Sequence, residues 1–103
     1  MTMEFYFDDK KCEEAGYLKE DCLNVIRRHF AKNNPNGTIK ETSEGIFEGA
    51  LKDINTFGFL VALEEKEWFR ETVSGWYWTI PEMESGKNRV DMIACAKKHD
   101  AWK

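Results

Sequence analysis

A chain of 103 residues with 42% hydrophobic and 33% charged residues has the size and balance of one globular domain, residues 1–103, and excludes a disordered chain. Its formal net charge is −4, and residues 41–84 hold ten acids against three bases, a local charge of −7. Because contact with a nucleic-acid backbone requires phosphate neutralisation, this acidic middle argues against nucleic-acid partners.

The sequence has no pattern typical of a membrane protein. Its longest nearly apolar run, residues 57–63, is much shorter than the roughly 20 residues that span a bilayer. The first residues have neither the basic start nor the long apolar run of a signal peptide. We therefore expect a cytoplasmic protein without membrane contacts.

The first third of the chain predicts a strand followed by a helix. Residues 3–7 are rich in aromatics and predict a short strand. Apolar residues then recur at helical spacing, which predicts an amphipathic helix over 18–32 that ends before the Asn-, Pro- and Gly-rich segment 33–37. The stripe expected to face the core comprises Leu18, Cys22, Val25, Ile26 and Phe30.

Residues 38–66 contain two segments that each fit either a helix or a strand. Alternation over 38–42 and the turn residues 43–45 predict a hairpin with 46–49, although the apolar residues of 46–54 also match a helix. Gly45 and Gly49 would weaken that helix by about 1 kcal/mol each. Asp53 is expected to cap a second helix over 54–66. Its apolar middle also fits a buried strand, but the strong helix formers that follow favour a helix.

The segment 68–80 contains three of the four tryptophans and predicts an aromatic β-hairpin. Its strands would be 68–73 and 76–80, joined by the tight turn Ser74-Gly75. Since side chains alternate along a strand, one face should enter the core. The core face would hold Phe69, Glu71, Val73, Trp76, Trp78 and Ile80. The outer face would hold Trp68, Arg70, Thr72, Tyr77 and Thr79.

The rest of the chain completes an α+β fold. Pro81 should end the hairpin, a polar link should follow over 82–86, and a last helix should run from 87 to 99, with Trp102 near its frayed end. We expect a mainly antiparallel sheet with helices packed on one face, in the approximate order β-α-β-β-α-β-β-α.

The sequence contains no motif for catalysis or for a cofactor. Three cysteines without a CxxC pair do not form a disulfide framework, and no phosphate-binding or metalloprotease motif is present. We therefore expect neither enzymatic activity nor a cofactor. An alternative is a metal- or thiol-dependent protein, because cysteines and histidines recur four and seven residues apart on the expected helices. Its residues would be Cys22, His29, Cys95 and His99.

These patterns favour a non-enzymatic protein-interaction or regulatory accessory domain, monomeric or weakly dimeric. Trp, Tyr and Arg are the residue types most enriched in interface hot spots. The expected binding residues are Trp68, Arg70, Thr72 and Tyr77, and the acidic surroundings would steer a partner with a basic surface. The alternative is that the same rings stack the bases of a single-stranded nucleic acid.

Overall fold

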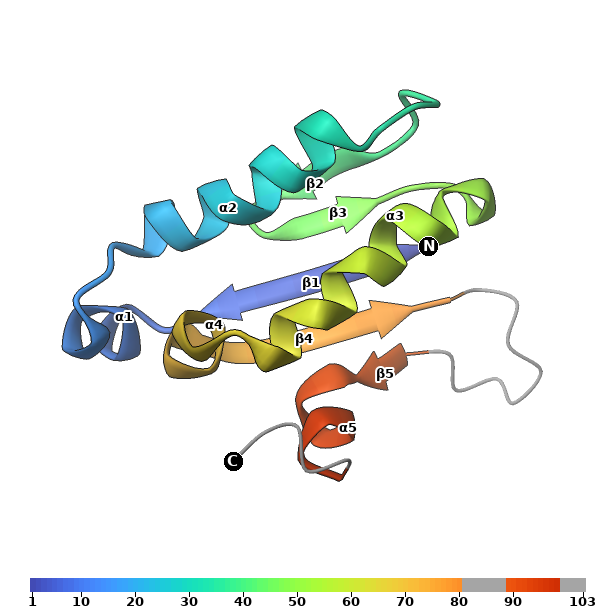
Figure 1. Ribbon diagram of the computed structural model, residues 1–103. Helices are drawn as coiled ribbons and strands as arrows, with labels where there is room; N and C mark the ends of the chain where they lie inside the picture. The colour runs from blue at the N-terminus through green and yellow to red at the C-terminus, as the bar shows by residue number, and fades with distance from the viewer. Residues whose placement is uncertain (81–88, 99–103) are drawn as a thin grey trace.

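The computed structural model describes residues 1–80 and 89–98 and has an α+β architecture (Figure 1). Five antiparallel strands form one sheet in the order β2-β3-β1-β4-β5. The strands are β1 (Thr2–Phe7), β2 (Lys40–Ser43), β3 (Ile46–Glu48), β4 (Val73–Thr79) and β5 (Arg89–Asp91). The predicted fold class is confirmed.

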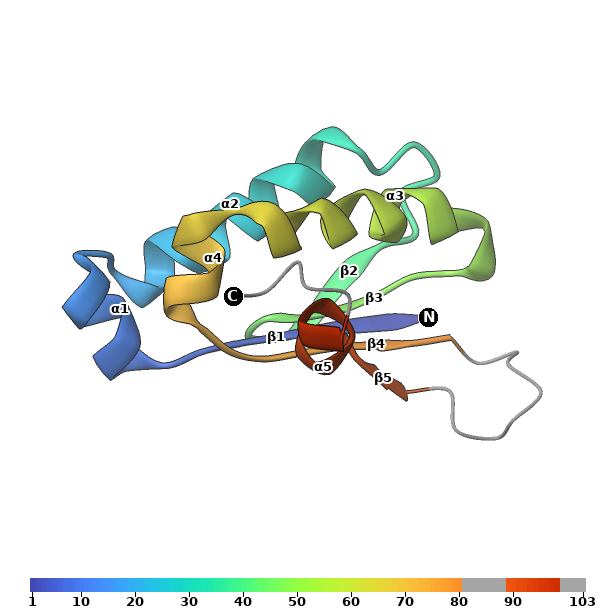
Figure 2. The same cartoon turned by 60° about the horizontal axis from the view of Figure 1, so that its bottom comes forward.

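Helices pack on one face of this sheet, where Figure 2 shows α2, α3 and α4 on the same side. The helices are α1 (Asp9–Ala15), α2 (Lys19–Lys32), η1 (Leu51–Asp53), α3 (Ile54–Gly58), η2 (Phe59–Glu65), α4 (Glu67–Thr72) and α5 (Met92–Lys98). No helix of the described residues covers the opposite face of the sheet, which we call the open face. None of the described helices is long and apolar enough to cross a membrane.

The central strand β1 divides the two faces of the sheet by alternation. Met3, Phe5 and Phe7 are buried under the helices, while Glu4 and Tyr6 point to the open face. Phe5 has three aromatic neighbours with ring centroids 6.2 Å away. These neighbours are Phe47, Phe69 and Trp76, which come from β3, α4 and β4. The core is therefore centred on β1.

The helix predicted over 18–32 is confirmed as α2, but its apolar stripe is only partly buried. Cys22, Ile26 and Phe30 are in the core, whereas Leu18 is 70% exposed and Val25 is 36% exposed. The buried face of the helix is shifted from the predicted stripe, because it includes Leu23 and leaves Val25 at its margin. Two apolar side chains of this helical segment therefore remain at the surface.

The short helix α1 was not predicted. The Asp8 carboxylate accepts a hydrogen bond from the backbone N–H of Lys11 (3.2 Å), which caps the first turn. Gly16 ends the helix with a φ of 83°, a conformation that glycine adopts without strain. Asp8 and Gly16 are typical residues for the two ends of a helix, so the sequence contained enough information to predict α1.

The predicted hairpin of 38–42 with 46–49 is confirmed as β2 and β3, and the helical alternative for this segment is wrong. The turn depends on Gly45, whose φ is 78°. Gly45 lies against β1 and accepts a hydrogen bond from the backbone N–H of Phe5 (2.8 Å). A register shift between Glu41 and Ser43 interrupts the pairing of β2 with β3.

Helical structure over 54–66 is confirmed, as α3 followed by η2, and Asp53 lies at the expected N-cap position of α3, but its side chain makes no capping hydrogen bond to that helix. Its buried carboxylate instead accepts hydrogen bonds from Thr38 Oγ1 (2.6 Å), the backbone N–H of Ala50 (2.9 Å) and Asn36 Nδ2 (3.1 Å). Burial raises the pKa of Asp53, but the three hydrogen bonds together outweigh it and hold the pKa below its ordinary value. Asp53 therefore joins the loop before β2 to the turn before α3.

The aromatic hairpin predicted over 68–80 is wrong. Residues 67–72 form α4, and β4 continues through Ser74-Gly75, where its register with β1 shifts, and pairs with β1 and β5. Helix is favoured because Phe69 and Thr72, three residues apart, both face inward and are fully buried. The backbone at Gly75 has no positive φ, so the expected turn is absent.

The last predicted helix begins later than expected. Residues 89–91 form β5 beside β4, and the helix begins at Met92 as α5. Asp91 stabilises that start by accepting a hydrogen bond from the backbone N–H of Ala94 (3.1 Å). Pro81, the link 82–86, His99 and Trp102 lie outside the described residues.

Replacement of Gly45 by Ala should destabilise the domain more than replacement of Gly37 by Ala. Both glycines have a positive φ, which costs an alanine roughly 1–2 kcal/mol. A Cβ on Gly45 would also collide with the carbonyl oxygen of Phe5, whereas a Cβ on Gly37 meets nothing. We expect Gly45→Ala to lower the free energy of unfolding in urea by about 3 kcal/mol or more. Equal losses in the two variants would contradict the close packing of the turn on β1.

Candidate functional site

The four residues predicted to bind a partner do not share a surface. Trp68, Arg70 and Thr72 lie on α4, on the helix-covered side of the sheet, whereas Tyr77 lies on the open face. Thr72 is fully buried and its hydroxyl donates to the Trp68 carbonyl oxygen (2.8 Å). The prediction placed all four residues on one face of a hairpin, but three of them lie on a helix, where side chains do not alternate between two faces. The shared outer face was therefore a wrong expectation, and a binding role for any one of these residues stays a prediction.

Trp68 nevertheless lines a surface hollow of about 360 Å³ between α2 and α4. This volume lies within the range of small-ligand pockets, and the wall is mostly apolar. Tyr17, from the loop between α1 and α2, forms another part of the wall. The remaining lining residues come from α2: Asp21, Cys22, Asn24, Val25 and Arg28. We call this feature the Trp68 hollow.

The hollow lies among exposed apolar side chains. Tyr17 is 41% exposed and Val25 is 36% exposed, and the neighbouring Leu18 is the most exposed large apolar side chain of the described residues, at 70%. Trp68 itself is half-buried and packs its ring edge-to-face on Phe69, with centroids 5.6 Å apart. A fixed indole beside open apolar area is the arrangement typical of an interface anchor.

One acidic side chain lines this apolar area, and four others lie close to Trp68 along the chain. Asp21 lines the hollow, and Glu71 lies one turn after Trp68 on α4. Glu64, Glu65 and Glu67 lie within four residues before Trp68 in the sequence. Among the described residues, none of these five acids has an ion-pair partner. Their charges are therefore available to attract a cationic partner.

A second cluster occupies the open face of the sheet. Arg89 on β5 donates two hydrogen bonds to the carboxylate of Glu4 on β1, at 3.0 and 3.2 Å. Its guanidinium carbon lies 3.8 Å from the centroid of the Tyr77 ring. Tyr6 completes the cluster by donating its hydroxyl to Glu4 (2.7 Å). The cluster joins three strands through one carboxylate.

The electrostatics of this second cluster follow from its hydrogen bonds. Arg89 holds the pKa of Glu4 below its ordinary value, against the opposing effect of burial. The hydrogen bond to Glu4 raises the pKa of Tyr6. Because Arg89 binds Glu4 and covers the Tyr77 ring, this cluster links β1, β4 and β5 and stabilises the sheet.

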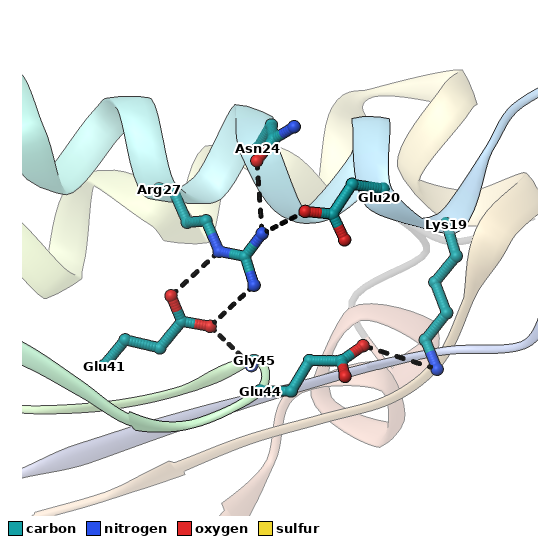
Figure 3. Close-up of polar contacts among 7 residues, drawn as sticks. All are labelled: Lys19, Glu20, Asn24, Arg27, Glu41, Glu44 and Gly45. Carbon is teal, nitrogen blue, oxygen red and sulfur yellow. Dashed lines mark hydrogen bonds and ion pairs between the residues drawn. The ribbon is translucent and has the colours of Figure 1, made fainter.

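The densest network of charged side chains joins α2 to the β2–β3 hairpin (Figure 3). Arg27 donates two hydrogen bonds to Glu41, at 2.8 and 3.0 Å, and one to Glu20 at 2.8 Å. Glu41 also accepts the backbone N–H of Gly45 (3.0 Å). Arg27 lowers the pKa of Glu41 from its ordinary value, whereas burial raises it. We read this network as a structural clamp that fixes α2, and with it one wall of the hollow.

The alternative built on cysteines and histidines cannot be traced as a set, because His99 lies outside the described residues. Cys22 is buried, and His29 Nε2 lies 3.0 Å from the carbonyl oxygen of Thr56. Burial and the neighbouring Cys22 raise the pKa of Cys12 to about 11, which keeps that thiol protonated and unreactive at neutral pH. Within residues 1–80 and 89–98, no three His, Cys, Asp or Glu side chains group to hold a metal ion.

Comparisons with known proteins leave the site to be interpreted from its own residues. No protein-family model matches the chain, and no curated protein or solved structure matches it significantly. The geometry described above is therefore the basis for any functional assignment.

Sequence reasoning missed most of the residues that build these two sites. Tyr17 and Asp21 carry no motif, and Val25 was assigned to the core. Glu4 and Tyr6 could have been found, because alternation from Phe5 places both on the opposite face of β1. Arg89 gave no such signal, since it lies in a segment with helical patterning.

Replacement of Glu4 by Gln should loosen the attachment of β5 in a pH-dependent way. The pKa of Glu4 is lower in the folded protein than in the unfolded chain, so its carboxylate stabilises the fold at a pH above the unfolded-state pKa. This contribution is lost as the pH falls through the folded-state pKa. We therefore expect E4Q to lower the Tm by a few degrees at about pH 7, and the difference from the wild type to shrink as the pH falls below the ordinary glutamate pKa of about 4.3.

Glu48 offers a matched control for this change. Glu48 lies on β3, next to the central strand β1 that carries Glu4, but it is exposed and has no ion-pair partner among the described residues. E48Q should leave the Tm unchanged at both pH values. If E4Q and E48Q behave alike at neutral pH, the Glu4–Arg89 pair does not stabilise the sheet.

Proposed function

We propose that this protein is a non-enzymatic interaction or regulatory accessory domain that binds another protein at the Trp68 hollow. The observation that carries the proposal is the hollow itself, about 360 Å³ with a mostly apolar wall. An indole and a phenol ring, from Trp68 and Tyr17, line it and supply rigid contact area at little cost in side-chain entropy.

The partner is a protein with a basic surface. The acids around the hollow have no ion-pair partners among the described residues, and exposed charges of one sign steer an oppositely charged partner and raise its association rate. The exposed side chains of Leu18 and Val25 extend the apolar contact beyond the hollow. The combination of an apolar centre with a charged rim is typical of protein interfaces.

The alternative of a single-stranded nucleic-acid binder has less support. Base stacking needs free aromatic faces on a basic surface. One face of the Tyr77 ring is covered by the Arg89 guanidinium, and the paired Glu4 carboxylate lies beside it. Trp68 belongs to the segment 41–84, whose net charge of −7 repels phosphate.

The free thiols of Cys12, Cys22 and Cys95 are compatible with action in a reducing compartment. We include the cytoplasm in the proposal on this basis. The binding unit in this proposal is a monomer or a weak dimer.

Replacement of Val25 by Glu should strongly weaken partner binding without unfolding the domain. Val25 lines the hollow and is 36% exposed, so a glutamate at this position can keep its charge in water in the free protein. Its carboxylate would be buried only when a partner covers the hollow, and that burial is costly. A photo-crosslinking residue at position 25 would identify the partner, and titration of the purified partner would measure binding. We expect V25E to weaken binding at least about thirtyfold, the effect of a hot-spot residue.

Ile54 provides the matched control. It is 39% exposed on α3 and does not line the hollow, so I54E makes the same change at a comparable site. I54E should bind the purified partner like the wild type, and both variants should keep the wild-type Tm. Equal binding by V25E and wild type would overturn the assignment of the hollow as the interface.

A further inference from the structure

We infer that the Trp68 hollow recognises an ammonium group, the side chain of a lysine presented by the partner. This inference rests on the proposed function and adds the chemistry of the group that enters the hollow. It is argued from the two rings, the carboxylate and the apolar wall that the hollow brings together.

Two aromatic residues line the hollow. Tyr17 and Trp68 both contribute to its wall, and Trp68 also packs its ring on Phe69. The volume of about 360 Å³ is many times the roughly 30 Å³ of a water molecule, so an extended side chain fits. An aromatic ring that faces such a space attracts a cation, and the indole does so most strongly.

The charge at one end of the hollow also favours a cation. Asp21 is exposed, lines the wall and has no ion-pair partner in the part of the chain that the structure describes. Arg28 is the one cation among the lining residues and lies seven residues further along α2, roughly 10 Å along the helix axis. The preferred position for a bound cation is therefore near Asp21, away from Arg28.

The apolar part of the wall selects the rest of the ligand. A lysine carries its charge on four methylene groups, which bury against apolar surface while the ammonium stays near polar groups. Val25 lies one turn after Asp21 on α2 and lines the same hollow. An alkyl stem packed on Val25 can thus place its ammonium beside Asp21 and the rings.

The test uses n-butylammonium, which reproduces the lysine side chain, and its neutral analogue n-butanol. Binding is followed by the NMR signal of the Trp68 indole N–H, assigned by its loss in W68F. We expect saturable binding of n-butylammonium in the millimolar range and about tenfold weaker binding of n-butanol. Equal binding of the two probes, or no binding of n-butylammonium, would overturn the inference.

Two variants at exposed positions test whether n-butylammonium binds beside Asp21. D21N removes the charge at an exposed position and should weaken n-butylammonium binding about fivefold, with little effect on n-butanol. E48Q changes an exposed acid of the sheet and should bind like the wild type. Equal effects of D21N and E48Q would show that only net charge attracts the probe. Failure of these probes alongside loss of partner binding in V25E would reject the ammonium and retain the interface.

Discussion

The packing of Phe5 on three aromatic side chains is the interaction on which the rest of the structure depends. Phe5 lies in the middle of the central strand β1, fully enclosed, with Phe47, Phe69 and Trp76 around it. These contacts join β3, α4 and β4 to one side chain. Because interiors are close-packed, the position of α4 over the sheet follows from this cluster, and α4 in turn supplies Trp68 to the hollow.

Local sequence patterns were sufficient to predict those helices and strands that are stabilised mainly by their own residues. The helical spacing of α2 and the turn residues around Gly45 predicted elements that the structure contains. The pattern failed at 68–80, where aromatic residues have high strand propensity but α4 is held by the burial of Phe69. Tertiary packing decided that segment, and a single sequence contains no direct record of it.

The candidate site was less predictable than the fold for the same reason. Trp68 was singled out by residue type, and that choice remains useful because the indole lines a hollow. Its neighbours there, Tyr17 and Asp21, are far from it in sequence and become adjacent only when α2 packs beside α4. Arg27 and Glu41 fix the orientation of α2 through side chains 14 residues apart, a distance that helical or strand periodicity does not report.

The interrupted pairing of β2 with β3 has a consequence for self-association. β2 is an edge strand whose four residues are all exposed, and edges with free backbone groups can recruit further strands into fibres. Here the irregularity between Glu41 and Ser43 distorts the edge, and Lys40 adds a charge. Both features disfavour pairing of β2 with a strand of another molecule. They therefore protect this edge of the sheet against aggregation at high concentration.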